Sequence, residues 1–284
     1  PLGSRGEFDM AKWGPLIDPG NENFTLLWAR IRDGFLKTLT AAGLAIVTSL
    51  VFGLALAVLR VQLKALRRRR FGGTGAGSLL LRALVWVLNA ITRLCVEVFR
   101  GTPVVIAIIF VWLGLSDLGL KFDNVLWYLV IGLTIYNGVV IAEILRSGME
   151  GLPGGQSEAA QALGLSPFQV TRIILLPQAL RIMLPALISQ LVVVLKDTSL
   201  GFIISYEEIM RVSTQTIQIL NNPIQTYIVV GAIYVTCNYA LSKLAVYTQH
   251  RLAHGRKTAT LTPAQDSAVL TDEIAAAGAR TQMR

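Results

Sequence analysis

The sequence predicts an all-α integral membrane protein with about five transmembrane helices. Three observations support this fold class: 53% of the 284 residues are hydrophobic, only 15% are charged, and the apolar residues gather in long segments. Soluble domains carry about 25% charged residues, and about 20 apolar residues are enough to cross a bilayer as a helix. The composition therefore excludes an ordinary soluble domain and predicts a multi-pass protein.

The chain begins with two segments that we expect outside the membrane. Residues 1–9 begin with PLGSRGEF, which resembles a protease-cleavage and cloning remnant. Residues 10–33 contain Pro15, Pro19 and Gly20 and are expected to form a short surface lead-in. The transmembrane domain is then expected over residues 34–250.

The first span is expected from Gly34 to Leu59, followed by a basic segment over residues 60–82. This segment contains FGGTGAGS, which lacks the Gly-Lys-Ser/Thr ending of a phosphate loop and therefore indicates a linker. The next apolar segment, residues 79–115, is longer than one straight span needs and is interrupted at Pro103. Proline removes an amide donor and disfavours helix at the preceding residue, so we expect a broken helix at membrane depth.

Three further spans are expected over residues 125–145, 182–204 and 225–247. Between the last two, residues 205–222 have a helical period and are expected at the outer surface, and residues 251–284 are expected to be a disordered cytoplasmic tail. Basic residues gather in the 60–82 loop and directly after the fifth span, which places both on the cytoplasmic side. Five spans then put the N-terminus outside and the C-terminus in the cytoplasm.

The loop over residues 147–178, between the third and fourth spans, is expected to contain two short helices joined at a corner. Ser157 can cap the first helix, and Gly164 supplies the left-handed residue that ends it. Ser166 and Gln169 have the spacing of a capping box for the second helix, which Pro177 is expected to stop. Such a corner suits a socket on another protein, although an ordinary well-capped loop would have the same local features.

Ionisable groups gather at the break in the second apolar segment. Such groups are costly inside a membrane and indicate function. The Arg100 guanidinium, beside Thr102 and the loosened backbone, could bind a carboxylate, and Glu97 lies on the same stretch. Alternatively, Glu97 and Arg100 pair with each other, because they stand three residues apart.

A second polar group lies in the outer half of the fourth span, at Lys196-Asp197-Thr198-Ser199. Adjacent residues point in different directions on a helix, so one of the two charges should face a polar cavity or another subunit. An aspartate and a cation would complement an amino acid zwitterion, and Asn137 of the third span could line the same path. The alternative is a helix end at the interface with a snorkelling lysine.

The sequence offers no catalytic triad, no Walker A motif and no metal site. Cys95 and Cys237 lie in apolar segments without ligand spacing, and His250 and His254 lack a third ligand. The chain is therefore not expected to be an enzyme or to hold a cofactor of its own. Much of the net charge of +9 lies beside spans, which indicates membrane topology and not nucleic-acid binding.

The corner loop resembles the EAA loop of bacterial ABC-importer permeases. Glu158-Ala159-Ala160, Gly164 and Leu176-Pro177 have the spacing of that motif. Three further stretches make the chain similar to the polar amino acid subfamily and, within it, to actinobacterial glutamate permeases of the GluD type: Arg100-Gly101-Thr102-Pro103, Glu143-Ile-Leu-Arg146 and Lys196-Asp197-Thr198-Ser199.

This resemblance implies a type I importer permease with cytoplasmic coupling helices in the bacterial plasma membrane. A second permease, identical or homologous, would complete the translocation path, and an extracytoplasmic amino-acid-binding protein would deliver the substrate, expected to be glutamate. An ABC ATPase dimer would bind ATP and Mg and receive the loop through Glu158, Ala159, Ala160, Gly164 and Pro177.

A different class of protein has to be kept open beside this one. A secondary transporter or channel for small polar solutes would work without ATP and would use Glu97, Lys196 and Asp197 as an ion relay. Such a protein would have no need of the cytoplasmic corner.

Overall fold

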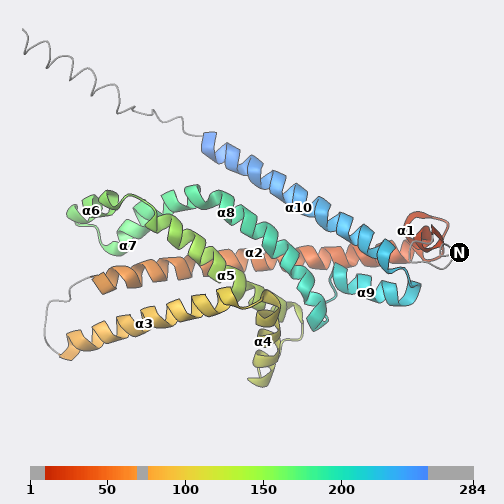
Figure 1. Ribbon diagram of the computed structural model, residues 1–284, viewed down its shortest axis with the longest axis horizontal. Helices are drawn as coiled ribbons and strands as arrows, with labels where there is room; N and C mark the ends of the chain where they lie inside the picture. Colours follow the sequence, from red (N-terminus) through yellow and green to blue (C-terminus); the bar gives the residue numbers. More distant parts are fainter. Residues whose placement is uncertain (1–9, 69–75, 255–284) are drawn as a thin grey trace, which may run out of the picture. The chain divides into compact units, whose positions relative to one another are not determined.

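The computed structural model describes residues 10–68 and 76–254, where all regular elements are helical (Figure 1). The predicted cloning remnant, most of the glycine-rich linker and nearly all of the tail lie outside the described residues. The chain divides after Val246 into two units, and the described part of the second, residues 247–254, is helical.

The helices follow one another in a simple order. They are η1 (Met10–Trp13), α1 (Gly14–Ile17), α2 (Phe24–Arg68), α3 (Ala76–Gly101), α4 (Val104–Asp117), α5 (Leu126–Glu150), α6 (Gly154–Ala162), α7 (Pro167–Gln169), η2 (Val170–Leu175), α8 (Leu176–Asp197), η3 (Thr198–Ile204), α9 (Ile209–Leu220) and α10 (Pro223–His254). Within the described ranges, five segments are long and apolar enough to cross a membrane: residues 24–67, 77–101, 126–150, 167–204 and 223–244.

The first long helix begins earlier than the sequence predicts. We placed residues 24–33 in a surface lead-in, but they form the first turns of α2. The charged residues in this stretch obscured an apolar face on which Leu27 and Ile31 are buried against Ile209 and Val230. Packing of that face explains why the helix extends beyond the apolar run.

Close contact between α2 and α5 forms the centre of the molecule (Figure 1). A Cβ atom at Gly53 would lie 2.7 Å from Cγ2 of Ile141 and 2.8 Å from the carbonyl oxygen of Gly138. Phe52 in turn lies directly over Gly138. The two helices therefore approach more closely than side chains at these glycines would permit, and α8 packs on the other side of α5.

A buried carboxylate joins α2, α9 and α10 at the opposite end of α2. Glu208 is completely buried and caps α9, accepting hydrogen bonds from the backbone N–H groups of Met210 at 2.8 Å and Arg211 at 2.7 Å. The Tyr234 hydroxyl of α10 donates to the same carboxylate at 3.3 Å. The backbone N–H of Ile209, the first residue of α9, donates to the hydroxyl of Thr38 on α2 at 3.2 Å. This polar junction connects α2 with α9 and α10, which come much later in the chain.

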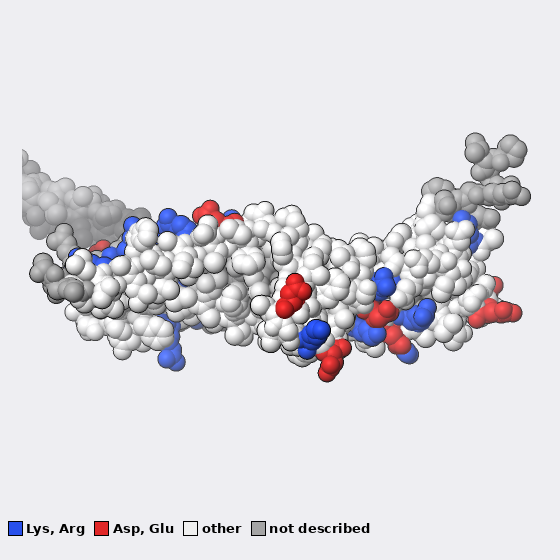
Figure 2. All heavy atoms as spheres, turned by 90° about the horizontal axis from the view of Figure 1, so that it is seen from below, with Lys and Arg blue, Asp and Glu red and all other residues white. Residues whose placement is uncertain are grey.

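Much of the apolar surface is left uncovered by the chain itself. On α3, Leu80 is 71% and Trp86 60% exposed, and on α10 Val235 is 69% exposed. Figure 2 shows a face whose surface is mostly uncharged, with acidic and basic side chains lying next to one another in a few patches. Helices with such surfaces need lipid or another apolar protein surface around them.

Replacing Gly53 with leucine is expected to lower the thermal unfolding temperature of the purified protein by at least about 3 °C. The added side chain must push α2 away from α5, and overpacking of this kind costs roughly 1–3 kcal/mol. Gly43→Leu is the matched control, because nothing lies within 4 Å of a Cβ atom at that position of the same helix. Equal unfolding temperatures for the two variants would contradict the close seam.

Glu208 predicts a pH dependence of stability. Burial raises the pKa of Glu208 to about 7, although the backbone donors that it accepts from oppose the shift. Between about pH 4.5 and pH 7, Glu208 therefore stays protonated in the folded protein but is ionised in the unfolded chain. Its contribution to the stability of the folded state is complete below about pH 4.5 and is lost as the pH rises to about 7. The difference in unfolding free energy between the wild type and Glu208→Gln should fall by up to about 3 kcal/mol across that window. A difference in unfolding free energy that does not change with pH would refute the role of Glu208.

Candidate functional site

The predicted corner is present between α5 and α8. Gly164 has a φ of +84° and lies directly after Leu163, the C-cap of α6. Residues 161–164 are exposed. Ser166 then caps α7: its hydroxyl accepts from the N–H of Gln169 at 3.3 Å, and its own N–H donates to the Gln169 side chain at 2.8 Å. Both the positive φ and the capping box are confirmed.

Two other features of the corner differ from the prediction. α6 begins at Gly154, directly after Pro153, so Ser157 lies inside the helix and accepts from the Gln161 amide at 3.2 Å instead of capping. Pro177 does not stop the second helix either, because it lies in the first turn of α8 and the chain remains helical. In a regular α-helix the ring of Pro177 would clash with the carbonyl of Ile173. The wider π-helical turn η2 precedes it and relieves that clash.

The outer face of the corner is partly apolar. Glu158 and Ala159 are exposed, whereas Ala160 is buried and packs inward. Leu163 is 84% and Phe168 51% exposed, and sequence reasoning overlooked both. Their position directly beside Gly164 and Ser166 was the available signal. An exposed apolar corner at this place has the character of a docking surface.

The break between α3 and α4 lies where the sequence predicts it. α3 ends at Gly101 and α4 starts after Pro103. The Thr102 hydroxyl donates to the carbonyl of Val98 at 2.8 Å, which leaves its lone pairs available. Arg100 is exposed. Among the described residues no ion pair joins Glu97, also exposed, to Arg100, so the alternative of mutual pairing is not realised.

A buried polar group connects α5 with α8. Asn137 is fully buried, donates to the carbonyl of Leu133 at 3.1 Å and accepts from the amide of Gln190 at 2.7 Å. The Asn137 amide also interacts with Asp197, which stands two turns after Gln190 on the same face of α8. Of the described atoms, none forms a hydrogen bond with the buried Oδ2 of Asp197. The structure thus brings together Asn137 and Asp197, and Gln190 is a member that the sequence reasoning missed.

The neighbouring Lys196 faces different surroundings from Asp197. It lines an open pocket of about 510 Å³ together with Ser199, Met210 and Tyr234. The hydroxyl of Ser199 donates to the carbonyl of Lys196 at 2.7 Å. Thr198 is buried, and its hydroxyl donates to the carbonyl of Leu195. The Lys196–Ser199 stretch therefore presents its two charges in different directions, as the sequence predicts.

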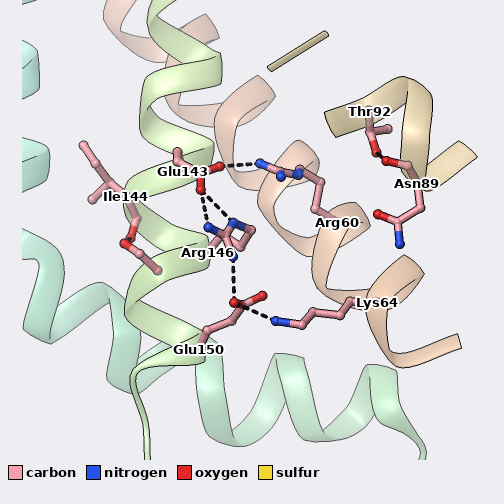
Figure 3. Close-up of polar contacts among 9 residues, drawn as sticks. Arg60, Lys64, Asn89, Thr92, Glu143, Ile144, Arg146 and Glu150 are labelled. Carbon is pink, nitrogen blue, oxygen red and sulfur yellow. Dashed lines mark hydrogen bonds and ion pairs between the residues drawn. The ribbon is translucent and has the colours of Figure 1, made fainter. Parts of the chain in front are cut away.

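Five charged side chains form a ladder between α2 and α5, close to the corner (Figure 3). Glu143 pairs with both Arg60 of α2 and Arg146 of its own helix. Arg146 also donates to Glu150 at 2.6 Å, and Lys64 of α2 lies 2.8 Å from the same carboxylate oxygen. These contacts between helices were not predicted from the sequence, because Arg60 and Lys64 belong to the basic 60–82 segment that was interpreted as a topology signal.

The structure offers no site for a resident metal ion within the described ranges, where no group of three or more histidine, cysteine or acidic side chains converges. No described hydrogen bond or ion pair joins Arg100 to Asp197 either. Arg100, the Asn137–Asp197 group and the charged residues between α2 and α5 therefore lie at separate places along the helices.

Comparison with known proteins supports this description. Residues 73–254 match the family described as binding-protein-dependent transport system inner membrane component. The chain is 38% identical over 257 residues to the glutamate transport system permease protein GluD of Corynebacterium glutamicum, covering 90% of this chain and 85% of that protein. It is 32% identical over 231 residues to the probable glutamine ABC transporter permease protein GlnP of Bacillus subtilis, covering 79% and 92% of the two chains.

A solved structure shares the fold. The chain superimposes on the crystal structure of an amino acid ABC transporter with histidines with a TM-score of 0.64 and 24% identity, covering 80% of this chain and 96% of that one. The family match and the identity to GluD confirm the resemblance seen in the sequence. The protein belongs to the binding-protein-dependent transport system inner membrane components and is a multi-pass, non-catalytic permease subunit of an amino acid ABC transporter.

Proposed function

We propose that this subunit forms part of the translocation path for a polar amino acid, glutamate in the first instance, and takes its energy from a separate ATPase. The observation that carries the proposal is the exposed corner at Glu158–Gly164, whose backbone is fixed by a positive φ and by the Ser166 capping box. A preformed, partly apolar knob with fixed geometry loses little entropy on docking. The ATPase dimer would bind ATP and Mg and receive this corner through Glu158, Ala159 and Gly164.

The corner is the feature that distinguishes the proposal from a transporter without ATP. Ala160 is buried beneath it, and Pro177 continues the helix that leads from it into α8, so these two residues support the docking face from behind. The cations Arg60 and Lys64 lie close to the corner, which supports a cytoplasmic corner, an outer N-terminus and a cytoplasmic C-terminus by the positive-inside rule.

Two polar groups on the spans complement an amino acid. Arg100, at the helix break, can bind a carboxylate through two donors, and the side chains of Glu97 and Thr102 lie on the same stretch. The unpartnered oxygen of Asp197, oriented by Asn137, can accept from an ammonium group. Lys196, Thr198 and Ser199 would line the outer side of the path. The relative named for glutamate makes this acidic amino acid the first substrate to test.

The uncovered surfaces of α3 and α10 support a second permease beside this one. Large apolar side chains on these helices, such as Trp86 and Tyr239, are exposed in the single chain. A second permease subunit, identical or homologous, would cover part of this surface and lipid the rest. A substrate-binding protein on the outer side would complete the importer.

The decisive experiment measures ATP hydrolysis in lipid by the chain copurified with its ATPase and any sister permease, with and without binding protein and glutamate. We expect ATP hydrolysis to be stimulated only when both the binding protein and glutamate are present. Gly164→Val should abolish this stimulation, because a β-branched residue at φ of +84° is strained and displaces the corner. Gly155→Val in α6, whose Cβ would meet nothing within 4 Å, is the control. Absence of any bound ATPase would favour a transporter that works without ATP.

Arg100→Ala is expected to reduce glutamate uptake by about tenfold or more while leaving assembly intact, since a charge-assisted hydrogen bond contributes about 1.5–3 kcal/mol. Uptake by proteoliposomes at saturating and subsaturating glutamate is the measurement. Arg93→Ala removes another exposed cation from the same helix and serves as the control. Unchanged uptake in the folded Arg100 variant would remove this residue from the site.

A further inference from the structure

The charged ladder between α2 and α5 is unusual for its depth and its position. Exposure of the side chains is 13% for Arg60, 17% for Glu143 and 24% for Arg146, and it rises to 28% for Glu150 and 44% for Lys64. The ladder thus runs from a nearly buried pair towards the solvent-exposed corner. Four of the five residues lie inside α2 or α5, and the fifth, Glu150, is the last residue of α5.

The lower end of the ladder reaches the corner itself. Lys64 and Glu150 line a hollow of about 490 Å³ whose opposite wall is formed by Gly154, Ser157 and Glu158 of α6. A force applied to the corner therefore acts directly beside the ladder.

A second polar contact fastens the same stretch of α2 to the other arm of the corner. The Gln62 amide donates to the hydroxyl of Thr171 at 2.8 Å and to the carbonyl of Pro167 at 3.4 Å. Arg60, Gln62 and Lys64 thus bind α5 and the α7–η2 segment within one turn of α2. Apolar packing of Ala57 and Val61 with Leu145 and Leu175 surrounds these contacts.

The far end of α2 is bound just as specifically. There Thr38 accepts from the first amide of α9, and Gly34 packs against the backbone of Ile209. α2 runs without interruption from Phe24 to Arg68 between these two ends. An uninterrupted helix that is bound at both ends can carry a displacement at one end to the segments bound at the other.

We infer that the Arg60–Glu143–Arg146–Glu150–Lys64 ladder is the joint that transmits displacement of the corner to α2, and through α2 to the outer helix α9. The inference rests on the proposed docking of an ATPase at the corner. Half-buried ion pairs contribute little net stability but select one arrangement against others. That property suits a joint, because slippage of α2 along α5 would leave charges unpaired.

The test compares coupling with stability. Glu143→Gln removes the charge shared by Arg60 and Arg146 with little change of shape. In the complete complex with ATPase, sister permease and binding protein, it is expected to lower the ratio of glutamate transported to ATP hydrolysed by about tenfold, within the usual range for coupling between sites. Basal ATP hydrolysis should remain.

Two further variants make the test specific. The exchange Arg60→Glu with Glu143→Arg restores an ion pair between the helices and should recover at least part of the transport ratio. Asp33→Asn breaks an exposed pair of the same helix, with Arg32 at 3.0 Å, and should leave the ratio unchanged. If the Glu143→Gln complex does not assemble, the double variant with the exchanged pair is measured instead. A double variant that assembles and recovers the transport ratio supports the joint. A double variant that hydrolyses ATP at the wild-type rate but transports nothing overturns it.

The outcomes separate this inference from the proposed function. If the wild-type complex binds no ATPase, the proposed function fails. If the wild type is stimulated by binding protein and glutamate and Glu143→Gln keeps the same transport ratio, only the joint is refuted. If Glu143→Gln lowers only the unfolding temperature and leaves the ratio of glutamate transported to ATP hydrolysed unchanged, the ladder contributes to stability and not to coupling.

Discussion

The close approach of α2 and α5 is the constraint on which the rest of the structure depends. Gly53 and Gly138 allow the two backbones to meet where larger residues would separate them. Inside a membrane, helices gain little from the hydrophobic effect on association, so small residues and polar contacts determine which faces meet. The seam fixes the position of α5, and α5 in turn positions Asn137 beside Gln190 and Glu150 beside Lys64.

Among the described residues, several places have irregular backbone, and three of them adjoin the candidate site or the Glu208 junction. The break at Thr102 and Pro103 loosens the backbone beside Arg100. The π-helical turn η2 joins the corner to α8, and the left-handed Ser205 begins the turn that leads to the Glu208 junction. Unpaired backbone groups are costly in lipid, so departures from the α-helix persist only where other contacts support them.

Local features could be predicted from the sequence, whereas features that depend on contacts between helices could not. The spans, the break at Pro103, the positive φ of Gly164 and the Ser166 capping box follow from residue types at fixed spacing. The start of α2, the role of Gln190 and the ladder from Arg60 depend on residues far apart in the chain. Pro177 was misinterpreted because its usual effect on a helix was cancelled by the wider turn before it.

The π-helical turn also constrains the length of this chain. Residues 170–175 hold one residue more than the regular α-helix needs over the same path. A chain shorter by one residue here would close into an ordinary α-helix, in which the ring of Pro177 would clash with the carbonyl four residues before it. The same deletion between Gln178 and Lys196 would swing Asp197 around the axis by about 100°, because each residue of an α-helix advances by that angle. The length of the chain is therefore constrained both at the corner and within α8.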